Sequence, residues 1–155
     1  MDPKKIIIVL LIFVSVYSFG QNLIPNPSFE DYNECPFNAG QLTKTSSWIN
    51  PNSGFSSSTP DFYHTCVTAF CSTSPIVCIP NNWTGHQFPR TGEGYAGIFV
   101  GVGLNSREYI ETPLLQTLVA GKQYELSFYV SLGDKYENAI DRIGAYFSKN
   151  KVEGS

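Results

Sequence analysis

The ten residues Gln123-Tyr124-Glu125-Leu126-Ser127-Phe128-Tyr129-Val130-Ser131-Leu132 carry the clearest pattern in the chain. Every even-numbered position is apolar or aromatic, and the odd-numbered positions are mostly polar. This alternation has the period of a β-strand, whose successive side chains point to opposite faces. A strand with one buried and one solvated face is typical of an antiparallel sandwich. The segment therefore predicts an all-β fold.

Further strands are expected on both sides of this segment. Residues 94–102 alternate small with large side chains, residues 107–112 form a strand-like run that ends at Pro113, and residues 140–148 supply one more. Upstream, residues 33–94 are polar and show no helical periodicity, so we expect short strands around Trp48 and around residues 62–66.

The composition excludes several classes of protein. The chain has 155 residues, which is enough for one domain. Charged residues make up only 15 %, and aromatic residues 14 %, with 10 prolines and 13 glycines. So little charge and so many turn formers argue against disorder and coiled coils and favour an extracellular all-β domain. The net charge of −3 argues against a nucleic-acid binder, which needs a basic footprint.

The first twenty residues are expected to be a secretory signal peptide. Lys4 and Lys5 precede an apolar run over residues 6–16 that only Ser15 interrupts, and Ser18-Phe19-Gly20 offers small residues for cleavage near Gly20. A membrane anchor is the alternative, but eleven helical residues span only about 16 Å of a roughly 30 Å hydrocarbon core. We therefore expect a protein that is secreted or lies on the extracellular face of the cell envelope. Once the signal is removed, we expect no transmembrane segment.

Four cysteines lie in the remaining chain, and their number is even. In an oxidising compartment they imply two disulfides, with three connectivities open. Zinc is the alternative, but no paired CxxC spacing is present. We expect Cys35 to pair with Cys66, and Cys71 with Cys78.

Several motifs together resemble the galactose-binding-like β-jelly-rolls, the fold of many carbohydrate-binding modules. The matching features are the opening at residues 22–30, Trp48, the run Gly94-Tyr95-Ala96-Gly97-Ile98 and the stretch at residues 118–130. More closely, the chain looks like the N-terminal domains of secreted surface proteins from Gram-negative gliding and gut bacteria. The segments that carry this closer likeness lie at residues 58–66, 79–82 and 85–92.

The resemblance implies that residues 21–155 form an antiparallel jelly-roll β-sandwich. Because the chain ends before the last strands of that fold, we expect the domain to be incomplete at its C-terminus. Modules of this kind often hold a structural calcium ion near the opening strand, and the resemblance makes Glu30 the first candidate ligand, with Asn26 beside it. The alternative is that Glu30 simply ends an edge strand and faces water.

Sugar binding requires aromatic faces that stack on rings and planar polar groups that bond hydroxyls. The loop-rich region offers six candidates: Tyr63, Asn82, Trp83, His86, Gln87 and Arg90. The alternative is that Tyr63 and Trp83 pack beneath the loops as a small core, as buried aromatic residues usually do.

Catalysis is not expected. Asp61, His64 and His86 share no ligand spacing, Glu108 and Glu111 fall on opposite faces of a strand, and Asp134 looks like a solvated turn charge. The expected function is a non-catalytic carbohydrate-binding or adhesion module whose partner is a glycan or a cell-envelope component. The alternatives are a structural spacer or protein-docking domain of an outer-membrane envelope protein, and the accessory domain of a secreted hydrolase.

Overall fold

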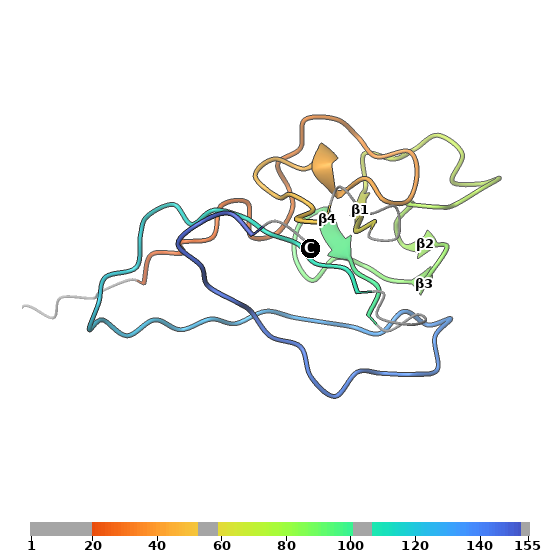
Figure 1. Cartoon of the computed structure of the whole chain (residues 1–155). Helices are drawn as coiled ribbons and strands as arrows, with labels where there is room; N and C mark the ends of the chain where they lie inside the picture. Colours follow the sequence, from red (N-terminus) through yellow and green to blue (C-terminus); the bar gives the residue numbers. More distant parts are fainter. Residues whose placement is uncertain (1–19, 53–58, 101–106, 153–155) are drawn as a thin grey trace, which may run out of the picture.

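The computed structural model describes residues 20–52, 59–100 and 107–152, so most of the predicted signal peptide lies outside the described residues. The described part contains almost no helix, only the 3₁₀ turn η1 (Leu42–Lys44). Its strands are short and antiparallel, and they form two small sheets (Figure 1). The all-β character is confirmed at this level, whereas the jelly-roll sandwich stays a prediction.

The larger sheet pairs β1 (Asp61–His64) with β4 (Gly94–Gly97), so that Tyr63 lies opposite Tyr95. All four residues of β1 are buried, and the rings of Tyr63 and Tyr95 stack with their centroids 4.7 Å apart. The Tyr63 ring also lies close to the backbone of Gly97, where a Cβ would be only 2.9 Å from the ring. The core is completed by Leu42, Val77 and Cys78. The predicted strand near residues 62–66 is thus confirmed, as is the beginning of the strand at Gly94.

The smaller sheet is a hairpin of β2 (Asn81–Asn82) and β3 (Gly85–His86), with Trp83 and Thr84 in its turn. Single bridges replace longer ladders elsewhere. Ile49 exchanges both backbone hydrogen bonds with Glu111, and Val100 forms a bridge with Arg107. The strands expected around Trp48 and over residues 107–112 are therefore reduced to isolated contacts.

Both predicted disulfides are confirmed. Cys35–Cys66 joins the opening of the chain to the residues just after β1, across a sequence separation of 31. Cys71–Cys78 closes a loop with a separation of 7, and its second half cysteine is buried in the core. The disulfides therefore fix loops that have few backbone hydrogen bonds of their own.

The opening residues do not form the strand that the resemblance implies for them. Residues 24–29 form bends and a turn, with positive φ at Asn26 and Phe29. Trp48 packs on this turn, because its ring stacks on Phe29 at 5.0 Å and its indole N–H donates to the Asn26 carbonyl at 2.8 Å. The opening is therefore held by an aromatic pair instead of a ladder.

Residues 114–152, which we call the extended segment, pass beside the labelled strands and double back, with turns at residues 120–121 and 134–135 (Figure 1). The predicted strand at residues 123–132 belongs to no sheet, and neither does the one predicted at residues 140–148. The alternating pattern marks two faces, yet a strand also needs a neighbouring backbone to bond with. No described segment lies alongside with such a ladder, so side chains on both faces are exposed. No helix in the described ranges is long and apolar enough to cross a membrane.

Candidate functional site

The β2–β3 hairpin brings together most of the candidate residues for sugar binding. Asn82 organises its turn: the side-chain oxygen accepts hydrogen bonds from the Thr84 amide at 2.9 Å and from the Thr84 hydroxyl at 2.6 Å. The Asn82 amide group donates to the Tyr95 hydroxyl at 2.8 Å, and the residue is buried. Asn82 therefore shapes the hairpin and does not face solvent.

Trp83 lies at the boundary between core and solvent. Its indole N–H donates to Asp61 Oδ2 at 3.3 Å, and its ring lies 5.1 Å from that of Phe99. The residue is nevertheless 38 % exposed, so part of the indole remains open. Trp83 can contribute one edge to a binding surface while it anchors the hairpin to β1.

Tyr63 belongs to the core. It is 1 % exposed, and its hydroxyl donates to Asp61 Oδ2 at 2.9 Å. Burial raises the pKa of Tyr63 and the pKa of Tyr95 above their usual range, so both phenols keep their protons. Burial also raises the pKa of Asp61, although a hydrogen bond of 2.6 Å from the Gly40 amide opposes the shift. Asp61, Tyr63 and Tyr95 therefore pack beneath the hairpin. Because it is buried, Tyr63 cannot stack on a ligand at the surface.

The extended segment docks on this hairpin through residues 131–135. The His86 amide donates to Asp134 Oδ2 at 2.8 Å, and the Lys135 amide donates to the Thr84 carbonyl at 3.1 Å. The Lys135 ammonium reaches the Trp83 carbonyl at 3.0 Å. Asp134 is exposed and lies in a turn, as expected, and its carboxylate in addition holds a hairpin amide.

This docking brings together a set of side chains that we call the hairpin face: His86, Gln87, Phe88, Arg90, Tyr129 and Ser131. All of them are exposed except Gln87, which is half-buried. The Arg90 guanidinium lies over the Tyr129 ring at 4.5 Å, and the Ser131 hydroxyl donates to Gln87 Oε1 at 2.7 Å. The His86 ring meets Phe88 edge-on at 5.3 Å. Tyr129 is 75 % exposed, and Phe88 is also largely open to solvent. The face therefore combines two accessible aromatic rings with amide, guanidinium and imidazole groups.

Three of the six candidates, His86, Gln87 and Arg90, lie on this face, Trp83 lies beside it, and Asn82 and Tyr63 lie beneath. The sequence reasoning missed Tyr129, Ser131 and Phe88 as partners. One clue was present for Tyr129, which is the only aromatic residue at an odd position of the segment at residues 123–132.

The candidate calcium ligands anchor loops. The two Glu30 oxygens accept hydrogen bonds from the Glu93 amide at 3.0 and 2.9 Å, and one of them also accepts from the Gly94 amide at 3.3 Å. The Asn26 side chain bonds the backbone of Asp31 and of Ser46. Within residues 20–52, 59–100 and 107–152 no group of three or more His, Cys, Asp or Glu side chains is arranged to hold a metal ion.

Two further acidic residues, Asp61 and Glu108, and the two histidines differ in their surroundings. Asp61 and His64 occupy opposite ends of β1 and are buried, whereas His86 is exposed and contacts Asn81. Glu108 is buried as well, and it accepts hydrogen bonds from the Thr59 amide at 2.6 Å and the Phe99 amide at 2.7 Å. These carboxylates are occupied by backbone donors, as in a structural role.

No protein-family profile, no curated protein and no solved structure matches this chain.

Proposed function

We propose that the chain is a secreted, non-catalytic module that binds a carbohydrate on the hairpin face. The observation that carries the proposal is Tyr129, which is 75 % exposed and is held in place by Arg90. A fixed aromatic ring gives an apolar surface for a pyranose ring, and the polar groups around it can bond hydroxyls. Because the ring is held before the ligand arrives, less side-chain entropy is lost on binding.

The wider setting of the proposal is a jelly-roll domain on the extracellular side of a bacterial envelope. The two disulfides support that compartment, because disulfides persist where the environment is oxidising. The occupied carboxylates of Asp61 and Glu108 support a role without catalysis, since a general acid or base must be able to reach its substrate. The resemblance stated above supports the sugar-binding class.

A glycan array tests this proposal. The oxidised chain is screened with and without calcium, beside the variants Tyr129→Ala and Tyr146→Ala. Tyr146 is 82 % exposed on the same extended segment, so it is a matched control for the loss of a surface tyrosine. We expect Tyr129→Ala to weaken binding about tenfold or more, as the loss of one stacked ring would, and Tyr146→Ala to leave it unchanged. A folded chain that binds no glycan, or equal binding by both variants, contradicts the proposal.

The second candidate is a protein-docking domain, and one specific observation favours it. Leu126, Phe128 and Val130 are exposed on an extended backbone that belongs to no sheet. Such an edge can pair with a strand from another protein, which gives main-chain hydrogen bonds and pockets for alternate side chains. Phe128→Asp separates the two candidates: under carbohydrate binding it leaves glycan affinity intact, whereas under docking it abolishes attachment to purified envelope fragments that Tyr129→Ala retains.

A further inference from the structure

A hollow lies between the two disulfides, and no residue of the hairpin face lines it. It has a volume of about 260 Å³ and is lined by Cys35, Cys66, Cys78 and the residues between them in space: Pro36, Phe37, Val67, Thr68, Ala69, Phe70, Ser74, Ile76 and Val77. No lining side chain is ionisable apart from cysteines that are all in disulfides. Only the hydroxyl groups of Thr68 and Ser74 are polar. The lining therefore offers no charged partner to a ligand and favours an uncharged one.

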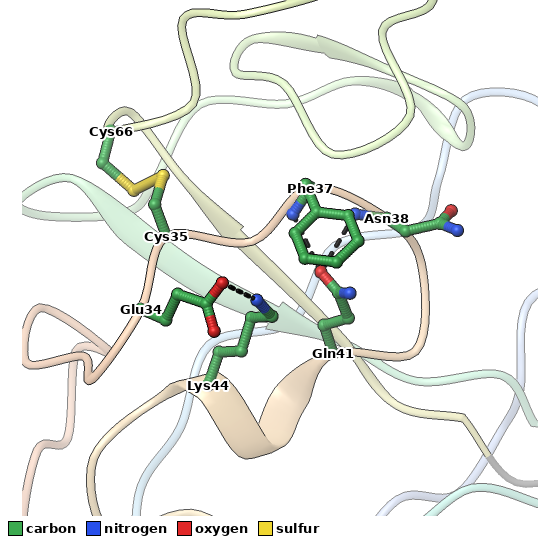
Figure 2. Close-up of polar contacts among 7 residues, drawn as sticks. All are labelled: Glu34, Cys35, Phe37, Asn38, Gln41, Lys44 and Cys66. Atoms are coloured by element: carbon green, nitrogen blue, oxygen red, sulfur yellow. Dashed lines mark hydrogen bonds and ion pairs between the residues drawn. A yellow bond between two sulfur atoms is a disulfide. The ribbon is translucent and has the colours of Figure 1, made fainter.

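One wall of the hollow is Phe37, and its loop is held from several sides (Figure 2). The Gln41 side-chain oxygen accepts hydrogen bonds from the amides of Phe37 and Asn38, at 2.8 and 3.0 Å. The Lys44 ammonium lies 4.2 Å from the centre of the Phe37 ring, and it forms an ion pair with Glu34 at 2.6 Å. Phe37 is 61 % exposed even so, which makes it an open ring in a fixed position.

A second aromatic lining residue is Phe70, which is 69 % exposed. Its backbone has a positive φ of 67°, and its carbonyl accepts hydrogen bonds from the Thr73 amide at 3.0 Å and the Ser74 amide at 2.7 Å. The disulfide of the next residue, Cys71, closes the same turn. A bulky residue rarely adopts this conformation unless the surroundings impose it. Both aromatic walls are thus displayed by loops that cross-links and hydrogen bonds hold in place.

The volume limits the size of an occupant. An apolar cavity of about 150 Å³ can hold benzene, so a hollow of about 260 Å³ has room for a bicyclic ring. Aromatic walls favour a flat partner, because rings gain from stacked or edge contacts beyond the area they bury. We propose that this pocket between the disulfides is a second binding site, which takes a small uncharged aromatic molecule about the size of indole. The site is separate from the hairpin face and does not depend on carbohydrate binding.

Titration of the oxidised, isotope-labelled chain with indole, followed by two-dimensional NMR, tests the proposal. We expect saturable shifts confined to residues 35–37, 66–70 and 74–78, with half-saturation on the order of 1 mM for so small a ligand. Indole-3-acetate, which carries a carboxylate, should bind at least about tenfold more weakly. Shifts that rise linearly without saturating, or that appear mainly outside these residues, would overturn the proposal.

Two variants of matched chemistry sharpen the test. Ala69→Trp places an indole side chain at the exposed lip of the pocket and should weaken the titration at least about tenfold, because it competes for the same space. Ala120→Trp adds the same group at an exposed position on the extended segment and should change nothing. Equal affinity in the two variants contradicts the site. Should Ala69→Trp lose the wild-type spectrum, nuclear Overhauser contacts from indole to Phe37 and Phe70 decide the matter in the unmodified chain, and their absence overturns it.

Discussion

Two regions of this chain differ in how well their strand pattern agrees with their packing. Residues 20–113 have short strands, yet they are closed by two disulfides and by buried carboxylates that accept backbone N–H groups. Residues 114–152 hold the best strand pattern, yet every residue from 119 to 132 is exposed. Local pattern sets the preference of a segment, but packing and cross-links decide whether that preference becomes a sheet.

The largest expected effect comes from the longer disulfide. Replacing Cys35 and Cys66 together by serine should lower the free energy of unfolding by roughly 3–4 kcal/mol, because the freed loop gains entropy in the unfolded chain. The same change at Cys71 and Cys78 should cost about 2 kcal/mol, since that loop is shorter. Urea denaturation measures both. A smaller loss for the first pair than for the second would contradict the claim that closing the longer loop contributes more to the stability of the fold.

Asp61 makes the stability of the folded chain depend on pH. Burial raises the pKa of Asp61 above its ordinary 3.8, so the folded chain keeps this proton to higher pH than the unfolded chain. The resulting stability is complete below about pH 3.8 and is lost as pH rises through the folded pKa, with a slope of up to about 1.4 kcal/mol per pH unit. Asp61→Asn cannot titrate. Its free energy of unfolding should therefore rise relative to that of the wild type as pH increases above 3.8.

Urea denaturation at a series of pH values follows this difference. Asp141→Asn, at a side chain that is 90 % exposed, is the matched control for the loss of a carboxylate. A wild type that gains stability over Asp61→Asn with rising pH would have the opposite sign and would contradict the burial of the Asp61 carboxyl.

Two glycines with positive φ compare the regions directly. A Cβ at Gly92, where φ is 65°, would lie within contact distance of the Glu30 carboxylate that bonds the Glu93 amide, whereas one at Gly121, where φ is 80°, would meet nothing within 4 Å. Gly92→Ala should therefore cost about 1–3 kcal/mol, from both strain and collision, and Gly121→Ala about 1 kcal/mol or less. Thermal unfolding of the two variants compares them. Equal losses would mean that the Glu30 anchor does not hold its loop.

The smallest effect is expected on the extended segment. Phe128→Lys should change the free energy of unfolding by less than about 0.5 kcal/mol, because Phe128 is exposed and lies in no sheet. In a packed strand the loss of a buried phenylalanine would cost about 3–5 kcal/mol. A loss of that size would show that Phe128 is buried in solution. It would contradict the difference in packing between the two regions.

Local features of the sequence could be predicted, and contacts between distant segments could not. The strand at Phe62 and the short loop closed by Cys71–Cys78 follow from residues close in the sequence. The pairing of Cys35 with Cys66 is the exception, because it was predicted correctly across 31 positions from the even number of cysteines. Tyr63 was placed with the binding candidates because an aromatic residue in a polar stretch gives no sign of its burial. Tyr129 was missed because its partner, Arg90, lies 39 positions earlier, and no periodicity within one segment shows which other segment it meets.

Hydrogen exchange tests most directly the claim that the two regions meet at a preformed hairpin face. The amides of His86 and Lys135 bond across the two regions, so we expect them to exchange at least about a hundredfold more slowly than an unfolded chain. The amides of residues 125–130 have no such partners among the described residues, and we expect them to exchange at nearly the unfolded rate. If His86 and Lys135 exchange as fast as residues 125–130, the face is not assembled in the free chain and the account is wrong.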